Sequence, residues 1–470
     1  MISDTVDATQ IYGGRQKDTI TIVGKASNSL IRGDANDDTI AVSGELNNTI
    51  IHGNAENDTL DISSVDVSSS TVYGGKGADL INISSDAINV IGGLGKDDIN
   101  ITSNKNHTIN GGEGEDTIDS SSTKSILIDG GSDKDTITLT GIADLGTIHT
   151  IKGGTGGDSI SGSSGNEFMD GGTKDDGKDT LISGGGDDTI YGGDGDDTIY
   201  GGGGNDTLYG NEGTDTIYGG DGNDQIYAGS SGGNETTNNN EQLIDAGSGD
   251  DRMYIRSGST NVKILAGDGD DHIDGDFRYL DAGSGDDFVE IYNYGYKVDY
   301  FDGGAGTDEL LIIPVHMSSG AGSDLWSSAI KNVEKITLRD SYSVNLGDQA
   351  AGDGQSIEID ASARENSSAG TFSVSSTFEG DITFKGTTGV DNVTLGKGDD
   401  VVTLGGGDDI VYSGLGSNTI DGGAGEDTVI YSGIKDSYTI QYEISNLFET
   451  ISVSKGSNKD LLTSIKTISL

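Results

Sequence analysis

The chain has 470 residues, of which 79 are Gly and 31% are hydrophobic, a composition that does not suit a conventional compact core. Its formal net charge of −52 predicts an expanded chain unless cations bind. So strong a negative field argues against nucleic acid or anionic lipid as a partner. The chain has no Cys, which excludes disulfides and thiolate metal sites. No stretch approaches the roughly 18 apolar residues of a membrane span, and residues 1–14 lack the features of a general secretory signal peptide.

Residues 1–152 contain seven nine-residue units whose starts are 18 to 21 residues apart. Each approximates G-G-x-G-x-D-x-U-x, where U is a large aliphatic residue. The glycines favour a tight turn whose carbonyls point at one spot, Asp adds a carboxylate there, and the last three residues favour a short strand. Between the units lies a second strand such as NSLIRG or INVIGG. We therefore expect a β-solenoid with calcium-type turns on one edge, preceded by an N-terminal cap at 1–12.

The turns of this first region are not equally good. In the first three units other residues replace the second or fourth Gly, namely Gln16, Asp34, Asn36, Asn54 and Glu56. We expect the metal sites of these units to be weaker or empty. The candidate metal ligands of the later units are Asp79, Asp98, Asp116 and Asp135.

The spacing tightens in the region 153–227, which we expect to form a regular roll with turns on two edges. It begins with GGTGGDSIS, which supplies Asp158, and continues through GSSGNEFMD and GGTKDDGKDTLI to five gapless units at 183–227. Two units per coil place residues 18 apart above one another, so the aliphatic residues form inward columns. Carboxylates stacked every ~4.8 Å would repel one another unless a divalent cation lay between the turns. Ligation by carboxylate and carbonyl oxygens alone selects Ca²⁺.

The five gapless units, SGGGDDTIY, GGDGDDTIY, GGGGNDTLY, GNEGTDTIY and GGDGNDQIY, resemble the RTX calcium-binding nonapeptide of type I-secreted bacterial proteins. The resemblance implies a right-handed parallel β-roll in which each unit holds Ca²⁺ jointly with the unit two further on. About ten to twenty Ca²⁺ would offset roughly twenty to forty charges, so folding should depend on calcium. The metal-site residues expected here are Asp188, Asp197, Asp206, Asp215, Asp224, Gly184, Gly186, Gly193, Gly195, Gly202, Gly204, Gly213, Gly220 and Gly222.

Residues 228–313 read as degenerate coils after a polar loop at 229–241. Residues 314–385 hold the only Pro and the only Trp, with alternating strands and a short helix expected near 324–332, so they read as a β-rich insert or cap. The candidate metal ligands of the degenerate coils are Asp251, Asp271, Asp287 and Asp308.

A second gapless set of units occupies 386–430 and is expected to form a second roll. Its fourth unit has Asn418 in place of Asp, which should weaken that site. The tail, 431–470, resembles the cap that ends many RTX proteins, and the resemblance implies an uncleaved signal for the type I secretion machinery. The candidate ligands of this roll are Asp391, Asp400, Asp409 and Asp427.

Catalytic motifs are not evident. The five histidines are scattered and form no H-E-x-x-H motif, so a zinc protease site is not expected and the chain reads as a non-enzyme. Outward tyrosines recur every nine residues from Tyr191 to Tyr227. They could form a carbohydrate platform, but stacking that stabilises the sheet is the commoner reason. Thr pairs such as Thr136 and Thr138 are too few for an ice-binding array.

We therefore expect an all-β, calcium-folded protein of the extracellular cell surface, such as a surface-layer component. Its partners would be calcium and either copies of itself or a surface glycan. Two alternatives stay open: a calcium-dependent adhesin or glycan-binding module, and a polysaccharide-modifying β-helix enzyme.

Overall fold

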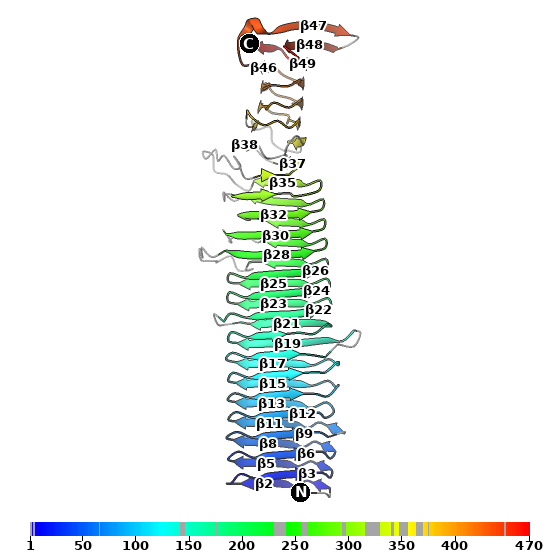
Figure 1. Ribbon diagram of the computed structural model, residues 1–470, viewed down its shortest axis with the longest axis vertical. Helices are drawn as coiled ribbons and strands as arrows, with labels where there is room; N and C mark the ends of the chain where they lie inside the picture. The colour runs from blue at the N-terminus through cyan, green and yellow to red at the C-terminus, as the bar shows by residue number, and fades with distance from the viewer. Residues whose placement is uncertain are drawn as a thin grey trace. The chain divides into compact units, whose positions relative to one another are not determined.

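The computed structural model describes residues 2, 5–64, 66–141, 146–173, 177–229, 241–255, 261–293, 298–314, 330–339, 343–346, 356–362, 370–374, 376–445 and 448–470. These residues form two units, Met1–Ala246 and Gly247–Leu470, each with its own internal contacts. Each unit is a stack of coils built from parallel strands (Figure 1). The expected all-β parallel solenoid is thereby confirmed.

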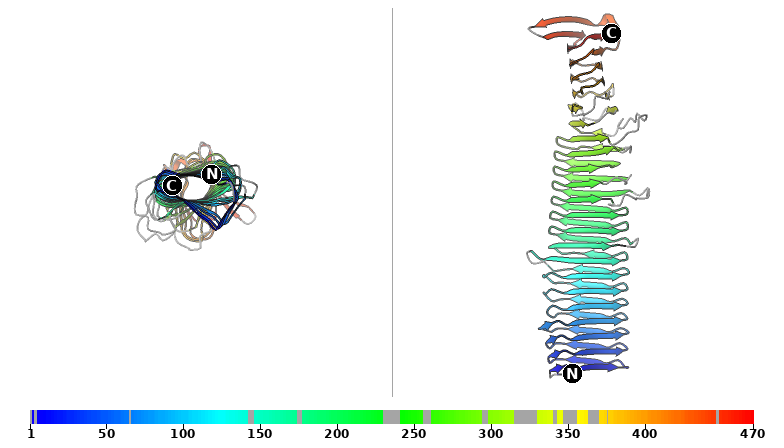
Figure 2. Two further views of the ribbon diagram at one scale, coloured as in Figure 1. Left: turned by 90° about the horizontal axis from the view of Figure 1, so that it is seen from below. Right: turned by 180° about the vertical axis from the view of Figure 1, so that it is seen from behind.

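Unit 1 has two long parallel sheets, whose strands lie side by side along the stack when seen from behind as well (Figure 2). Consecutive coils add one strand to each sheet, so that every strand pairs with the strands one coil before and after it. The first sheet comprises β3 (Thr19–Ile22), β6 (Thr39–Val42), β9 (Thr59–Ile62), β12 (Leu80–Ile83), β14 (Asp98–Ile101), β16 (Thr117–Ser120), β18 (Thr136–Leu139), β20 (Ser159–Ser161), β22 (Thr180–Gly185), β24 (Thr198–Gly203), β26 (Thr216–Asp221) and β28 (Gln242–Ser248), the last of which contains the unit boundary. The second sheet comprises β2 (Gln10–Gly14), β5 (Leu30–Ala35), β8 (Ile50–Ala55), β11 (Thr71–Lys76), β13 (Asn89–Leu94), β15 (Thr108–Glu113), β17 (Leu127–Ser132), β19 (Ile148–Thr155), β21 (Asn166–Gly172), β23 (Thr189–Asp194), β25 (Thr207–Glu212) and β27 (Gln225–Ala228).

The first coils of unit 1 have a third, short side that the sequence pattern did not predict. Its four two-residue strands pair in parallel in the order β1-β4-β7-β10. They fall in the segments between units, where no glycine pattern marks them. These strands are β1 (Val6–Asp7), β4 (Ala26–Ser27), β7 (Leu46–Asn47) and β10 (Val67–Ser68).

In the regular roll the strands are longer than the three residues expected from the repeat. Strand β23, for example, continues from Thr189 through Gly192 to Asp194. The first three residues of each unit therefore extend the preceding strand, and the turn is confined to positions four to six. A Cβ at position 192 would lie 2.7 Å from the carbonyl oxygen of Gly210 in the next coil, so only Gly allows this close approach of the strands.

In the regular roll the core of unit 1 contains two columns of aliphatic side chains, one from each sheet. As expected, Ile190, Leu208 and Ile226 form one column, and Ile199 and Ile217 belong to the other. All five side chains are fully buried. Burying such side chains stabilises the fold by about 1.5–3 kcal/mol each, which offsets the cost of ordering so glycine-rich a chain.

Unit 2 repeats the parallel arrangement with three sets of strands. The first set comprises β30 (Val262–Asp268), β32 (Tyr279–Ser284), β34 (Tyr300–Asp302) and β36 (Ile330–Lys331). The second comprises β29 (Arg252–Ile255), β31 (His272–Gly275), β33 (Phe288–Asn293), β35 (Glu309–Pro314), β37 (Lys335–Leu338), β39 (Ile357–Asp360), β41 (Ile382–Lys385), β43 (Val401–Thr403), β45 (Thr419–Asp421) and β49 (Asn458–Thr463). The third comprises β38 (Ser343–Leu346), β40 (Gly370–Val374), β42 (Asp391–Thr394), β44 (Ile410–Tyr412), β46 (Thr428–Ile430) and β50 (Thr467–Ser469).

The region 314–385, expected as a β-rich insert or cap, is indeed built of strands in its described parts. Strands β37, β39 and β41 pair in parallel with one another and with β35 and β43 on either side. These strands therefore extend the ladder of coils. Residues 324–329 of the expected helix and residues 230–240 of the expected loop lie outside the described residues, and Ile330 and Lys331 are in a strand.

The tail closes unit 2 by pairing with the last coil of the second roll. Strand β49 pairs with β45 and β50 pairs with β46, both in parallel. Between them in sequence, β47 (Thr439–Ser445) and β48 (Phe448–Lys455) form an antiparallel hairpin, preceded by the 3-10 turn η1 (Lys435–Ser437). No helix in the described ranges is long and apolar enough to span a membrane.

Candidate calcium sites

The sixth residues of the units form a continuous ladder along one edge of unit 1, which we name the first acidic ladder. In each coil the backbone N–H of the sixth residue donates a hydrogen bond to Oδ1 of the sixth residue one coil later. For Asp58 and Asp79 this N···O distance is 2.8 Å. The ladder comprises Asp18, Asp38, Asp58, Asp79, Asp97, Asp116, Asp135, Asp158, Asp179, Asp197 and Asp215.

Further ladders follow the same rule. The second acidic ladder of unit 1 comprises Glu167, Asp188, Asp206 and Asp224. In unit 2 one ladder runs through Asp251, Asp271, Asp287, Asp308 and Glu334. Two more serve the second roll, one of Asp391, Asp409 and Asp427 and the other of Asp400, Asn418 and Asp460.

The second carboxylate oxygen is the unusual feature of these ladders. Oδ2 of Asp197 and of Asp206 is buried and has no hydrogen-bond partner within the described structure. Each Oδ2 faces the first Gly of its own unit: a Cβ at Gly192 would lie 2.7 Å from Oδ2 of Asp197 and 2.7 Å from the carbonyl oxygen of Gly210. An unsatisfied carboxylate oxygen thus lies beside a main-chain carbonyl of the next coil. Oxygen atoms of these two kinds are the ligands that Ca²⁺ prefers.

Burial makes these carboxylates costly to ionise in the absence of a cation. Desolvation raises the pKa of Asp197 to about 6 and the pKa of Asp188 to about 8. The charges of Glu167 and Asp206 add to the shift at Asp188. A cation beside the carboxylates would reverse the shift, because an opposite charge favours the ionised form.

The ligand set fits calcium better than a transition metal. Within the described ranges there is no group of three or more His, Cys, Asp or Glu side chains that could enclose a metal ion. A metal on the ladders must therefore take most of its ligands from backbone carbonyls of the turns. Gly195, at the fourth position, has a φ of 128° and gives the turn its shape, whereas Gly193, with a φ of 114°, lies near the end of the strand that leads into the turn. Hard oxygen ligands in an adaptable turn are typical of Ca²⁺ sites.

Nearly all of the expected ligands lie on the ladders. The nine glycines from Gly184 to Gly222 named as site residues all have positive φ, at the ends of strands or in the turns that follow them. Asp98 is an error of position: in GGLGKDDIN the sixth residue is Asp97, which is 1% exposed, whereas Asp98 is exposed at the start of β14. The first of two consecutive aspartates is the one that follows the turn. Sequence reasoning also missed Asp179, which is displaced by the three extra residues of its twelve-residue unit.

The second and third N-terminal units keep the same turn although other residues replace its second and fourth glycines. Asp34, Asn36, Asn54 and Glu56 all adopt positive φ, between 70° and 91°. Asp38 and Asp58 are consequently held in the ladder and buried. Weaker calcium binding at these sites stays a prediction. Its physical reason is that residues other than Gly hold the turn in a strained conformation.

The fifth residues form a second row of hydrogen bonds that runs in the opposite direction. The N–H of Asn205 donates to Oδ1 of Asp187 in the preceding coil at 2.8 Å, and Asn223 donates to Asn205 in the same way. These side chains are exposed. The recurring D-D and N-D pairs of the repeats carry the signal for this row: the fifth residue ties its coil to one neighbour and the sixth ties it to the other.

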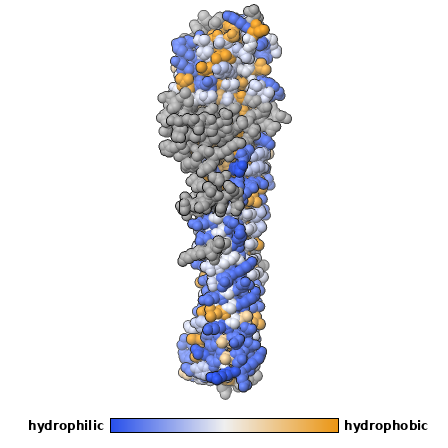
Figure 3. Space-filling view, turned by 90° about the vertical axis from the view of Figure 1, so that its left-hand side faces the viewer, coloured by the Kyte–Doolittle hydropathy of each residue, from blue (hydrophilic) through white to orange (hydrophobic). Residues whose placement is uncertain are grey.

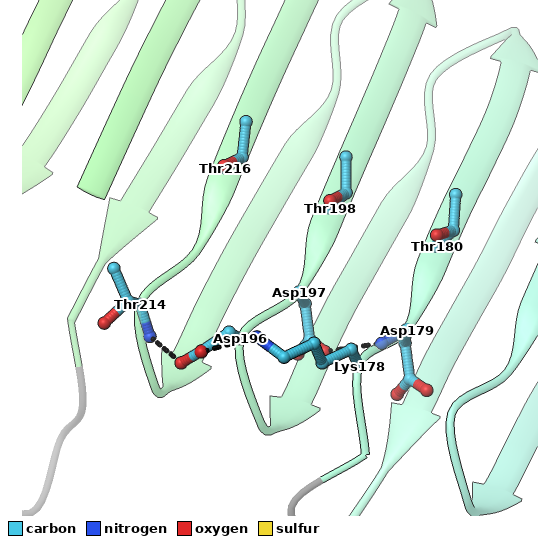
Figure 4. A pocket seen from close by; sticks show the side chains of 8 residues that line it. All are labelled: Lys178, Asp179, Thr180, Asp196, Asp197, Thr198, Thr214 and Thr216. Carbon is cyan, nitrogen blue, oxygen red and sulfur yellow. Dashed lines mark hydrogen bonds and ion pairs between the residues drawn. The ribbon is translucent and has the colours of Figure 1, made fainter. Parts of the chain in front are cut away.

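A polar groove of about 350 Å³ runs over three turns of the first edge (Figure 4). Nζ of Lys178 forms an ion pair with Oδ2 of Asp196 in the next coil at 2.7 Å, and this hydrogen bond lowers the pKa of Asp196. The threonines at the seventh position stand in register along the groove. The groove is lined by Lys178, Asp179, Thr180, Asp196, Asp197, Thr198, Thr214 and Thr216.

The outward tyrosines are stacked on one another. The rings of Tyr191 and Tyr209 are 4.5 Å apart and inclined by 2°, and those of Tyr200 and Tyr218 are 4.7 Å apart and inclined by 4°. Their faces therefore cover each other, and these stacks leave little ring face for a sugar. The arrangement agrees with a role in stabilising the sheet.

Comparison with known proteins agrees with this geometry. The sequence model of a family described as "RTX calcium-binding nonapeptide repeat (4 copies)" matches residues 12–44, 101–122, 150–176, 174–208, 200–231, 385–420 and 405–433. No curated protein matches the chain.

Proposed function

From the premise that this chain carries RTX calcium-binding nonapeptide repeats, we propose that it is an extracellular structural protein of the cell surface that folds when calcium binds. The observation that supports calcium-driven folding best is the row of buried carboxylates whose second oxygen has no partner, as at Asp188 and Asp206. An ionised carboxylate in that position costs several kcal/mol unless a cation accompanies it.

The proposed mechanism links metal binding to folding. Inside the producing cell calcium is scarce, so a chain with a formal net charge of −52 stays expanded and can pass through a secretion channel. Outside, sites of the extracellular type, with Kd near 10⁻⁴ to 10⁻³ M, fill and stabilise the folded state. Because each ladder residue bonds to the next coil, filling one site orders the neighbouring one.

The one Ser–His contact found in the described part of unit 1 lacks the proton arrangement of a nucleophile and its base. Nε2 of His107 lies 2.6 Å from Oγ of Ser103, but Nδ1 accepts a hydrogen bond from the N–H of Ile88. The proton is therefore on Nε2, which donates to Ser103, and the imidazole cannot act as a base toward that hydroxyl.

Assembly into a surface layer rests on the repetitive exterior of the units. On the face drawn in Figure 3 hydrophilic residues predominate and hydrophobic ones form small separate groups. Contacts between copies on such a face would be polar and bridged by calcium. The covered tyrosine faces give the glycan-binding alternative less support.

A calcium titration of the purified chain, followed by circular dichroism and light scattering, tests both parts of the proposal. We expect β structure to appear cooperatively at millimolar Ca²⁺ and particles to grow at the same time, with no such change in Mg²⁺. A matched variant in which Asp188, Asp197, Asp206, Asp215 and Asp224 are all Asn keeps the side-chain shape and should lose much of the transition. β structure that forms fully in a chelator would contradict calcium-driven folding, and persistent monomers in calcium would contradict the surface layer.

A further inference from the structure

The second acidic ladder continues a column of equivalent residues, one from each coil. In the earlier coils of unit 1 the residues of this column are not acidic. Strand pairing and the regular hydrogen bonds from position seven to position six define this column. Its side chains occupy the inward position just before the seventh residue of each coil. In order it contains Ile88, His107, Ile126, His149, Glu167 and Asp188.

Two neighbours in this column are buried without enough hydrogen bonds. His149 has no exposed surface, and neither of its ring nitrogens has a partner in the described structure. Glu167 is 2% exposed; its Oε1 accepts a hydrogen bond from the hydroxyl of Ser163, whereas its Oε2 has no partner. Three buried polar atoms of these two neighbours in the column are thus left without a hydrogen bond, which is unfavourable in a buried position.

The same column shows that packing does not require an imidazole here. One coil earlier Ile126 occupies the equivalent position, 2% exposed, so an aliphatic side chain fits. Two coils earlier His107 is 3% exposed, but its nitrogens contact Ser103 and the N–H of Ile88. His107 is therefore satisfied by the protein and His149 is not. An unsatisfied imidazole that an isoleucine could replace indicates a ligand.

His149 and Glu167 are direct partners in the pairing of β19 with β21, on the inward face of both strands. Their Cα atoms are therefore about 5 Å apart, the ordinary spacing of paired strands. At that spacing an imidazole nitrogen and a carboxylate oxygen can reach a single ion between them. We propose that His149 and Glu167 bind one divalent cation of the Zn²⁺ class at the start of the second acidic ladder.

The chemistry of this site differs from that of the calcium turns. Imidazole nitrogen with carboxylate oxygen suits Zn²⁺, Co²⁺ or Ni²⁺, whereas Ca²⁺ takes oxygen ligands. With two side-chain ligands the remaining positions would be filled by backbone carbonyls or water. The ion would neutralise Glu167, the first carboxylate of this ladder. No acidic residue occupies the same position in the coil before it, where His149 stands.

Equilibrium dialysis against Zn²⁺ in saturating Ca²⁺ tests the proposal on the full-length chain. The informative variant is His149→Ile, because the chain carries Ile at the same position one coil earlier. We expect wild type to retain one more equivalent of Zn²⁺ than His149→Ile, and X-ray absorption of the Zn²⁺-loaded wild type to show a nitrogen ligand. His272→Gln, which changes a histidine of unit 2, should bind as much Zn²⁺ as wild type.

Equal Zn²⁺ uptake by wild type and His149→Ile would overturn the site. The alternative would then be a direct hydrogen bond between His149 and Glu167 without a metal. A shell of oxygen alone around the bound Zn²⁺ would overturn the site too. This second outcome needs no variant, so the proposal can be overturned even if His149→Ile folds poorly. We expect His149→Ile to fold with calcium as wild type does. If it does not fold, Ile cannot replace His at this position, and the inference drawn from Ile126 is wrong, whereas the calcium sites are not affected.

Discussion

The two edges of unit 1 differ in chemistry although they belong to the same coils. On the first edge the sixth residue is an aspartate in every coil from Asp18 to Asp215. On the second edge the equivalent residues include Ser29 and Ser70, and the acidic side chains begin only at Glu167. The coils stack with the same pairing on both edges.

The serine hydroxyls of the second edge show that aspartate is not needed to accept the backbone hydrogen bond between coils. Oγ of Ser70 accepts a hydrogen bond from the N–H of Thr49 at 3.1 Å, as Oδ1 of Asp79 does from Asp58 at 2.8 Å. A serine thus satisfies the backbone without burying a charge. Asp79 carries an additional oxygen, Oδ2, that is buried without a hydrogen-bond partner in the described structure, and a bound cation would satisfy it. Packing and neutral hydrogen bonds can therefore hold the uncharged second edge, whereas we expect the acidic ladders to require calcium.

Removal of calcium should have the largest effect, and the effect should differ along unit 1. In a chelator we expect amide hydrogen exchange to accelerate most in 183–227, where both edges are acidic. Coils between 20 and 130, with one uncharged edge, should lose less protection, because repulsion acts on one side only. Hydrogen exchange read by mass spectrometry in Ca²⁺ and in chelator measures this, and uniform loss along unit 1 would contradict the distinction.

A single substitution places a serine, as found on the second edge, in an acidic ladder. Asp206→Ser keeps an acceptor near the N–H of Asp188 but removes the carboxylate. We expect fewer bound Ca²⁺ and a loss of about 1–3 kcal/mol of unfolding free energy in calcium, with a smaller effect in chelator. Asp187→Ser, at the exposed fifth position, is the control and should change either quantity little. Calorimetry with Ca²⁺ and denaturant unfolding provide both measurements, and equal losses in the two variants would refute the assignment.

The repeat made most of the fold predictable, because its aliphatic residue and its aspartate recur at fixed offsets. The inward columns of Ile190 and Ile199 follow from that period alone. The short third side at Ala26 and Leu46 did not, since two-residue strands lack a period that could reveal them. Asp98 was named one residue too late: it is the seventh residue of its unit, and the sixth, Asp97, is the buried one that joins the ladder.

The site residues that escaped prediction have no motif of their own. Glu167 and Asp460 lie on ladders through strand pairing, although neither follows a turn with the full glycine pattern. His149 shares the column of Glu167 through the pairing of β19 with β21. Loop lengths decide such pairings, and a composition of Ser, Gly and Asp does not fix them.

Acid should partly replace calcium on the acidic edge. In the metal-free fold burial raises the pKa of Asp97 to about 7 and of Asp135 to about 8, from the ordinary aspartate value of 3.8. Between pH 4 and 8 the folded state therefore binds more protons than the unfolded state, so its stability falls as pH rises through this window. In chelator we expect more β structure at pH 5 than at pH 8. With calcium the trend should reverse, because protons compete with the metal for the carboxylates. Circular dichroism across this range checks both, and a pH-independent spectrum in chelator would contradict the burial of these groups.

The smallest effect should come from the strained turns at the start of the first edge. Glu56 adopts φ of 70°, a conformation that costs a non-glycine residue about 1–2 kcal/mol, of which the lower backbone entropy cost of Glu over Gly recovers part. Glu56→Gly should therefore raise the unfolding free energy by about 0.5–1 kcal/mol and tighten calcium binding near Asp58. Glu56→Gln removes the charge and keeps the strain, so it measures the contribution of the charge alone, and the difference between the two variants gives the conformational part. Denaturant unfolding of the two variants in saturating calcium decides between them: an equal gain would show that the side-chain charge, and not the shape of the turn, weakens this end of the ladder.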